Sequence, residues 1–394
     1  MKHIFYTLIL ICITLGLVEL ILPLFIELPN PYAHLEVNRF SSGSVIRLQN
    51  PRNTDITFLF RPNDLFPEGE SVVNDIHINN YGFRHDEDID SVKKEYRIFA
   101  IGGSTTQGYD YLYEKTWCQV LEKGLEKKYN IPINVYNGGT AGAAMFDHIA
   151  LLQNRAIHLQ PDMIILFAGV NDLNLLVGDK NKFRFDDIYE KSESITWFKL
   201  LLGKSSIFKL VKNAKENLTK SDLDKGLKER KHRPLPKGIP VQFADQILPS
   251  LVTQALPLGT NPEVDFEYYK KMVASFIGTC KANGIPLFII TQPTTWLCND
   301  DALQKYHWMN KNKDSRFDKK FMQASMNKMN DDVAKLAIEN NVPIFRAETK
   351  IPNDGEYFYD DCHFTPKGSV FMGNMMSDFV LQNDLVKPMI SVTK

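Results

Sequence analysis

The sequence has few cysteines and almost no net charge, and each shortage excludes a class of protein. Its 394 residues include five cysteines, none in a Cys-x-x-Cys pair, so neither a disulfide framework nor a zinc site of that kind is indicated. Lysine and arginine number 46 and aspartate and glutamate 47, so the basic excess typical of nucleic-acid-binding proteins is missing. We therefore expect no nucleic-acid partner.

The N-terminus carries the longest apolar run, residues 4–26, interrupted only by Glu19 and Pro23. About 20 apolar residues are enough to cross a hydrocarbon core of about 30 Å. A cleaved signal peptide or a buried soluble helix would also be apolar, but no small-residue cleavage site follows the run. We expect residues 1–28 to be an uncleaved transmembrane signal-anchor, with the rest of the chain extracytoplasmic, either periplasmic or extracellular. Glu19 opposes this, because a carboxylate inside a membrane is costly.

The remaining chain has two parts with different patterns. Residues 29–95 contain short alternating runs, typical of an accessory N-terminal segment of strands and turns. From Tyr96, strands alternate with helices, which predicts an α/β domain with a parallel sheet over residues 96–385. The expected strands are 97–101, 133–136, 163–168, 286–290 and 342–345, and the expected helices are 116–129, 145–158, 266–283, 317–340 and 366–381.

An insertion at about 175–263 interrupts this alternation and is far longer than ordinary connections of about 4–6 residues. Between Lys204 and Lys237, eleven Lys and Arg residues stand against four Asp and Glu residues. Two interpretations stay open: a solvated helical lid, or a surface that meets an anionic membrane or polymer.

Four polar or glycine-rich turns hold the candidate functional residues. In an open parallel sheet, turns at the carboxyl ends of the strands gather at one edge, where ligands bind. Three of the turns directly follow expected strands, and the fourth directly precedes the last helix. They are Gly102-Gly103-Ser104-Thr105-Thr106, Asn137-Gly138-Gly139-Thr140-Ala141-Gly142, Gly169-Val170-Asn171-Asp172 and Asp360-Asp361-Cys362-His363.

Together these turns contain the parts of an acyl-transfer site. The Ser104 hydroxyl needs a base to become nucleophilic, and His363 can supply it. Asp360, three residues before His363, can orient the imidazole. A tetrahedral intermediate also needs fixed donors, and the backbone N–H groups of Ser104 and Gly142 and the side-chain amide of Asn171 are available for an oxyanion hole.

In their order and spacing the four turns resemble the conserved blocks of the SGNH (GDSL-like) hydrolase superfamily. The resemblance places the nucleophile on Ser104, the block-two glycine on Gly142 and the block-three asparagine on Asn171. The Asp-x-x-His pair of the family falls on Asp360 and His363. The resemblance covers about residues 96–381, except for the insertion.

The resemblance implies a three-layer α/β/α, flavodoxin-like fold with a parallel central sheet, and no metal or cofactor. It also implies a serine esterase that hydrolyses an O-acyl ester. The expected extracytoplasmic location favours a carbohydrate or cell-envelope substrate with O-acetyl as the acyl group, while lipid and small-molecule esters stay open. The partners expected are an acylated small molecule or polysaccharide and a membrane, the latter through the N-terminal helix; the oligomeric state stays open. Two alternatives use the same scaffold: an O-acyltransferase and a non-catalytic, membrane-tethered glycan-binding module.

The sequence departs from the family pattern at the nucleophile, where Gly-Gly-Ser-Thr-Thr replaces Gly-Asp-Ser-Leu. This variant is common among bacterial members that look membrane-anchored, some of which share the Asn-x-x-Gly-Phe-Arg stretch found here at Asn79 to Arg84. Other site types fit less well. A phosphate loop would need lysine where Tyr109 stands, an α/β-hydrolase elbow would need glycine in place of Thr106, and a metal site at Asp360 to His363 lacks a further ligand cluster.

Overall fold

The computed structural model describes residues 2–25, 50, 52–60, 72–108, 111–178, 202–211, 242–243, 257–310 and 315–387. The chain divides into two compact units, residues 1–42 with 185–240 and residues 43–184 with 241–394. The insertion expected at about 175–263 lies largely outside the described residues. The expected domain boundaries at 28/29 and 95/96 stay predictions.

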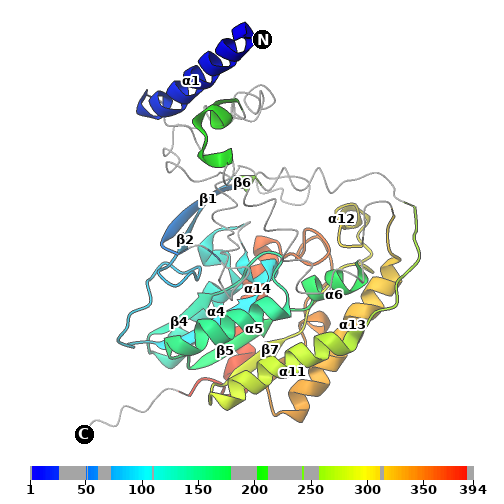
Figure 1. The fold of residues 1–394 in the computed structure, drawn as a ribbon. Helices are drawn as coiled ribbons and strands as arrows, with labels where there is room; N and C mark the ends of the chain where they lie inside the picture. The colour runs from blue at the N-terminus through cyan, green and yellow to red at the C-terminus, as the bar shows by residue number, and fades with distance from the viewer. Residues whose placement is uncertain are drawn as a thin grey trace. The chain divides into compact units, whose positions relative to one another are not determined.

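A five-stranded parallel sheet forms the centre of the larger unit (Figure 1), with the strand order β4-β3-β5-β7-β8. Numbered along the chain within this sheet, that order is 2-1-3-4-5, the order of flavodoxin-like folds, so the predicted fold class is confirmed. The strands are β3 (Tyr96–Gly102), β4 (Ile133–Asn137), β5 (Met163–Phe167), β7 (Leu287–Ile290) and β8 (Ile344–Phe345). The last strand is shorter than the expected 342–345, because Pro343 has no N–H to donate to a sheet.

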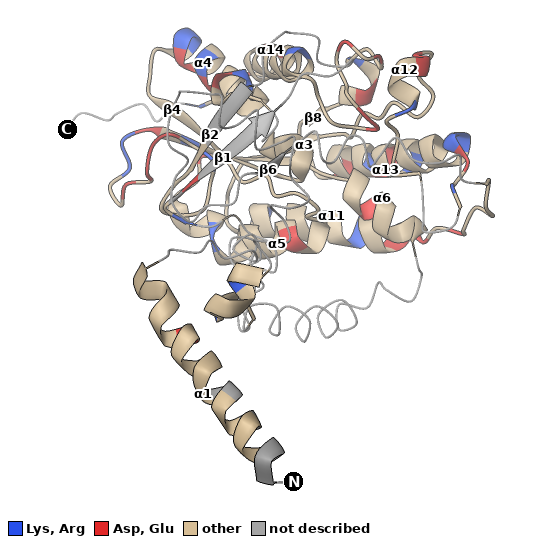
Figure 2. Ribbon diagram, turned by 90° about the horizontal axis from the view of Figure 1, so that it is seen from above, with Lys and Arg blue, Asp and Glu red and all other residues tan. Residues whose placement is uncertain are grey.

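Helices cover both faces of this sheet, and strand β5 shows how the sequence makes that possible. Ile164 and Leu166 join one hydrophobic cluster, while Ile165 and Phe167 join the other, so both faces of the strand are apolar. Figure 2 shows the two helical layers, one of α5 (Met145–Asn154), α11 (Phe266–Ala282) and α13 (Lys319–Glu339), the other of α4 (Trp117–Tyr129) and α14 (Pro366–Gln382).

Polar side chains cap the N-termini of four of these helices. Thr116, Asp265, Asp318 and Thr365 each accept a hydrogen bond from a backbone N–H in the first turn of the helix that follows. The expected helix 145–158 instead ends at Asn154 and continues as a separate 3₁₀ turn. The shorter helices are α3 (Ser104–Gln107), α6 (Val170–Val177), α12 (Asp301–Gln304), η1 (Tyr113–Lys115), η2 (Ala156–Leu159) and η4 (Ala347–Thr349).

A small second sheet, of order β2-β1-β6, belongs to the same unit. Its strands are β1 (Thr54–Phe60), β2 (Val72–Ile78) and β6 (Gln242–Phe243). Isolated bridges from Ile78 to Arg84 and from Arg84 to Asn137 continue the hydrogen bonding from β2 to the end of β4. The accessory segment is thereby tied to the edge of the central sheet.

The Asn-x-x-Gly-Phe-Arg stretch forms the turn that makes this connection. The Asn79 side chain accepts hydrogen bonds from the backbone N–H groups of Tyr81 (3.0 Å) and Phe83 (3.1 Å). Gly82 has φ 82°, which favours glycine. The turn delivers the guanidinium of Arg84, which is 1% exposed, to three backbone carbonyls just after the glycine-rich turn of β3: Gln107 (3.0 Å), Tyr111 (3.1 Å) and Gly108.

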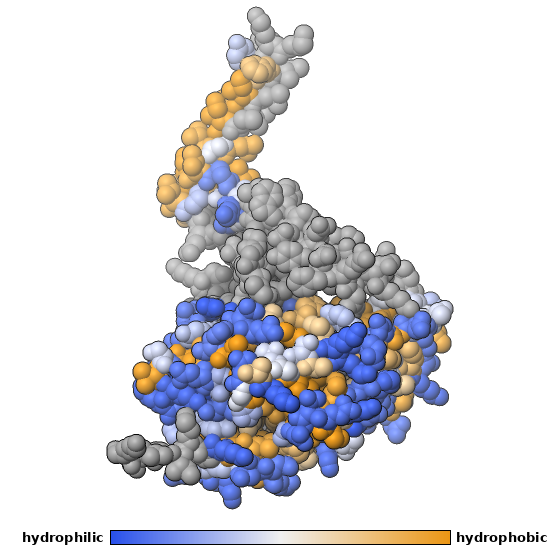
Figure 3. Space-filling model, turned by 60° about the horizontal axis from the view of Figure 1, so that its bottom comes forward, coloured by the Kyte–Doolittle hydropathy of each residue, from blue (hydrophilic) through white to orange (hydrophobic). Residues whose placement is uncertain are grey.

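Helix α1 (Lys2–Phe25) corrects the expectation of a membrane anchor. Its exposed side chains are mostly apolar (Figure 3), but Glu19 accepts hydrogen bonds from Ser205, Ser206 and Ile207, at the start of helical residues 206–211. Slight burial raises the pKa of Glu19, but the hydrogen bonds from Ile207 and Ser206 outweigh this effect. The net pKa lies below its ordinary value, so the carboxyl stays charged.

No helix in the described part of the chain combines the length and the apolar character needed to cross a membrane. The prediction of a signal-anchor over residues 1–28 is therefore wrong, and the extracytoplasmic placement that was derived from it loses its basis. Glu19, the carboxylate within the apolar run, is the residue that opposes a membrane-spanning role.

Arg84→Ala should destabilise the larger unit strongly. The substitution leaves the carbonyls of Gln107, Gly108 and Tyr111 without their guanidinium donor, and each buried unsatisfied group costs about 1–3 kcal/mol. Denaturant unfolding followed by tryptophan fluorescence measures the change. Lys94→Ala, which breaks only an exposed ion pair, is the control and should change stability by less than about 0.5 kcal/mol. Equal midpoints for the two variants would contradict the role given to Arg84.

Candidate active site

Ser104 lies at the junction of β3 and the short helix α3, which begins at this residue. Two glycines precede it because the backbone there is tightly packed. A Cβ on Gly103 would lie 2.7 Å from Nδ2 of Asn171, and a Cβ on Gly102 would lie 2.5 Å from a backbone oxygen of β5. The Oγ atom of Ser104 lies 2.6 Å from Nε2 of His363, 259 residues further along the chain.

His363 and Asp360 lie in a closed turn before α14. The backbone N–H of Tyr359 donates to the carbonyl of His363, and Oδ1 of Asp360 accepts the backbone N–H groups of Cys362 (3.0 Å) and His363 (2.9 Å). Oδ2 of Asp360 lies 2.7 Å from Nδ1 of His363. The structure therefore brings the three predicted residues, Ser104, His363 and Asp360, into one hydrogen-bonded line.

Burial and charge act on the two ionisable members of this line in opposite senses. Burial by itself lowers the pKa of His363, but the neighbouring Asp360 carboxylate raises it well above its ordinary value. Burial raises the pKa of Asp360, and the charge and hydrogen bonds of His363 then bring it below its ordinary value. At neutral pH Asp360 is therefore the anion of the pair, and its charge favours an imidazolium beside it.

The two predicted oxyanion donors beyond Ser104 come from neighbouring turns. Gly142 has φ 74° in the turn after β4, and no atom of the described residues would lie within 4 Å of a Cβ there. Asn171, in the first turn of α6, donates from Nδ2 to the carbonyl of Ala143 at 2.9 Å, which fixes the orientation of its amide. Gly139, in the same turn, already donates its N–H to Oδ1 of Asn137 at 2.9 Å. Its backbone also packs against Gln107, where a Cβ would lie 2.2 Å from the nitrogen.

Three residues near Asp360 were missed from the sequence. Nε1 of Trp308 donates to Oδ2 of Asp360 at 3.0 Å, and Oγ1 of Thr295 donates to its backbone carbonyl at 2.7 Å. Asp361 is fully buried and accepts hydrogen bonds from Trp296, Trp308 and Met309. Trp308 and Thr295 lie outside the four turns, and no periodicity marks them.

Asp360, Cys362 and His363 place one ligand atom each within 4.8 Å of one another, so a metal ion has to be considered. Both ring nitrogens of His363 already face partners, Ser104 and Asp360. Burial raises the pKa of the Cys362 thiol to about 11, so the thiolate that a metal prefers does not form near neutral pH. The donor set does not fit a metal.

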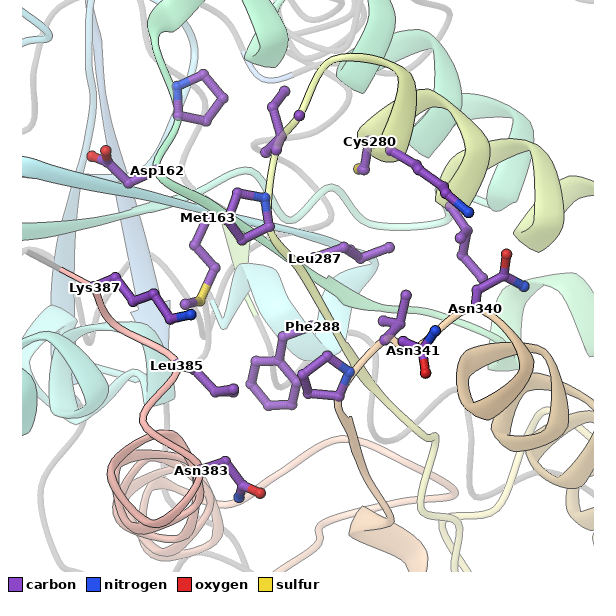
Figure 4. Close-up of a pocket in the computed structure, with 18 of the residues that line it drawn as sticks. Asp162, Met163, Cys280, Leu287, Phe288, Asn340, Asn341, Asn383, Leu385 and Lys387 are labelled. Atoms are coloured by element: carbon purple, nitrogen blue, oxygen red, sulfur yellow. The ribbon is translucent and has the colours of Figure 1, made fainter.

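Described residues line a cavity at each of two opposite sides of the sheet. One, of about 620 Å³, lies at the amino ends of the strands, away from Ser104, and its lining includes Asp162, Met163, Leu287 and Phe288 (Figure 4). The other, of about 510 Å³, lies beyond the carboxyl ends of β7 and β8. Its lining is mostly polar and includes Thr294, Gln323, Asn327, Glu348, Lys350 and Asn353.

Several solved structures are distantly similar to this chain. They include the acetyl xylan esterase AlAXEase (13% identity, 72% of this chain and 99% of that chain, TM-score 0.39) and the acetylxylan esterase Axe2 from Geobacillus stearothermophilus (12%, 75% and 98%, 0.39). A GDSL-like lipase from Bacteroides thetaiotaomicron is similar to the same degree (14%, 74% and 89%, 0.37). Likenesses this distant carry no information on substrate. No curated protein matches the sequence.

The family assignment rests on the sequence itself. Residues 100–370 match the profile of the GDSL-like lipase/acylhydrolase family, and this match covers more than half of the chain and spans all four turns. The resemblance to SGNH hydrolases is thereby confirmed. The chain belongs to the GDSL-like lipase/acylhydrolase family and is a carboxylic ester hydrolase.

Proposed function

We propose that this ester hydrolase is a serine esterase that works through an acyl-enzyme on Ser104. One observation carries the proposal: Oγ of Ser104 lies 2.6 Å from Nε2 of His363, while Nδ1 of the same ring lies 2.7 Å from Asp360. This is the geometry of a nucleophile, a general base and an orienting carboxylate.

In the first half-reaction His363 takes the proton of Ser104 as Oγ attacks the ester carbonyl carbon. The backbone N–H groups of Ser104 and Gly142 and the side-chain amide of Asn171 stabilise the resulting oxyanion. The imidazolium, stabilised by Asp360, then gives its proton to the departing alkoxide, leaving an acyl ester on Ser104. In the second half-reaction His363 takes a proton from water as the water oxygen attacks the acyl carbon. The imidazolium then returns this proton to the departing Oγ of Ser104, which releases the carboxylic acid and regenerates the free serine and neutral His363.

We further propose that the substrate is an O-acetyl ester of a carbohydrate. Gly103 packs closely against the Asn171 amide next to Ser104, since a Cβ on Gly103 would lie 2.7 Å from Nδ2, and such close packing favours a small acyl group. The polar cavity beyond β7 and β8 lies at the same edge of the sheet, and its hydroxyl, amide and charged side chains suit a polyhydroxylated alcohol.

The substrate proposal is tested with acetylated oligosaccharides and a series of simple esters of increasing acyl length. Acetyl esters should be cleaved fastest, and a preference for long acyl chains would overturn the proposal. An added sugar alcohol shows whether the acyl-enzyme reacts with water or with an alcohol, because acyl transfer yields a new ester instead of free acid.

Ser104→Ala should abolish ester cleavage, by on the order of 10⁴-fold or more in kcat, without unfolding the protein. The measurement is turnover of an acetyl ester, together with labelling of the unmodified protein by a serine-directed phosphonate. Ser275→Ala, which removes an exposed hydroxyl from α11, is the control and should leave both unchanged. Normal turnover by Ser104→Ala would refute the acyl-enzyme.

Asn171→Ala should lower kcat by about 10²–10³-fold and change KM much less, because its amide acts on the oxyanion and not on the bound ester. Steady-state kinetics separates the two constants. Asn174→Ala, one turn further along α6, changes the same kind of side chain and serves as the control. A rise in KM with unchanged kcat would mean that Asn171 binds substrate instead.

The pH dependence should follow the ionisation of His363. Only the neutral imidazole can accept the Ser104 proton, and Asp360 raises the pKa of His363 well above its ordinary value of 6.5. We therefore expect kcat/KM to be low at pH 6.5 and to rise with pH through a single ionisation above that value. Asp360→Asn should shift this ionisation downwards and weaken catalysis strongly. A rise centred below pH 6.5 in the unmodified enzyme would contradict the assignment.

A further inference from the structure

We propose that Trp308 is a positioning residue for the Asp360–His363 pair, and that the buried carboxylate of Asp361 holds Trp308 in that place. The inference rests on the proposed function, because it concerns the same base and orienting carboxylate. It adds a second layer of residues, from a segment outside the four turns, on which the geometry of the pair depends.

The indole of Trp308 contacts both members of the pair. Nε1 donates to Oδ2 of Asp360 at 3.0 Å, and this is the same oxygen that lies 2.7 Å from Nδ1 of His363. The indole and imidazole planes are within 9° of parallel, with ring centroids 6.5 Å apart. One side chain therefore fixes the rotation of the carboxylate and borders the ring that the carboxylate orients.

Asp361 fixes the backbone from which this indole extends. Its Oδ2 accepts the backbone N–H groups of Trp308 (2.6 Å) and Met309 (3.2 Å), and its Oδ1 accepts Nε1 of Trp296. The Asp361 side chain is fully buried, so these three donors stand in for water. Thr295 completes the connection, because its N–H donates to the carbonyl of Asp361 at 2.9 Å and its hydroxyl donates to that of Asp360.

The adjacent carboxylates of Asp360 and Asp361 thus have different partners. Asp360 faces the imidazole, and Asp361 faces away from it towards the segment 296–309. Burial and the charge of Asp360 raise the pKa of Asp361 to about 7. The hydrogen bonds from Trp308, Met309 and Trp296 act in the opposite sense and favour the charged carboxylate. Other polar groups near the pair are the Cys362 thiol beside His363 (3.7 Å), the Tyr359 ring parallel to the imidazole, and His307, 2.9 Å from the Thr295 hydroxyl.

The loss of the indole N–H has a predictable electrostatic sign. A donor on Oδ2 withdraws negative charge from the oxygen that stabilises the imidazolium. Without it, the Asp360 carboxylate attracts the proton of His363 more strongly, so the pKa of His363 rises further. The carboxylate also becomes freer to rotate, so fewer enzyme molecules hold His363 in the correct orientation.

Trp308→Phe tests this, because phenylalanine keeps an aromatic ring beside the imidazole and removes the N–H. We expect kcat to fall by about tenfold, as for one lost hydrogen bond to a charged group, with KM changed less than about twofold. The ionisation seen in kcat/KM should move to higher pH. Trp117→Phe is the matched control: its indole N–H lies in the core with no hydrogen-bond partner among the described residues, so it should change stability and not the pH profile.

Asp361→Asn is the second variant, because it replaces one acceptor oxygen by an NH₂ group. It therefore weakens the hydrogen bonds that hold the backbone of Trp308 and leaves the indole itself unchanged. It should lower kcat, as Trp308→Phe does, with KM changed much less. A folded Trp308→Phe enzyme with unchanged kcat and pH profile would overturn the proposal. So would variants that lose activity only in proportion to lost thermal stability, since that is a purely structural role. Esterase activity retained by Ser104→Ala would instead overturn the proposed function.

Discussion

The hydrogen bond between Ser104 and His363 joins two residues that lie far apart in the sequence. It depends on the side of the sheet at which the carboxyl ends of the parallel strands lie. Ser104 follows β3 and His363 precedes α14, and 259 residues separate them. Because neighbouring strands run the same way, both turns reach the same edge. The apolar clusters on the two faces fix that sheet, so the geometry of the polar line is set by hydrophobic burial.

Around this line, buried and half-buried polar residues hydrogen-bond to the backbone more than to one another. Arg84 satisfies carbonyls that follow α3, Asn171 satisfies the carbonyl of Ala143, and Asp361 satisfies three N–H groups. Each of these hydrogen bonds restricts the motion of a turn, because breaking it would leave a polar group unsatisfied at a cost in folding free energy. The Asp360–Asp361 pair shows how local this effect is: adjacent carboxyls have pKa values displaced in opposite directions by their different partners.

The sequence predicted the strands and helices of the sheet because their apolar patterns are strong, and it predicted the four turns because motif residues cluster within a few positions. It failed for Trp308 and Thr295, whose importance arises from contacts with Asp360 across more than 50 residues. It also failed for helix α1, where hydrophobicity outweighed Glu19. The short β8 shows a third limit, since one proline decided the length of the strand.

The hydrogen bonds from Arg84 to the carbonyls of Gln107, Gly108 and Tyr111 bear on the order in which the site is assembled during synthesis of the chain. Chains are made from the N-terminus, at about 5–20 residues per second, and segments fold as they become available. Arg84, Asn137 and the turn at Ser104 all precede His363 in the chain, so this turn can fold against β3 and β4 before His363 is synthesised. Under the proposed mechanism the nascent chain then holds Ser104 in place without its base. Hydrolysis by that mechanism needs α14 to pack against α4 and His363 to reach Ser104.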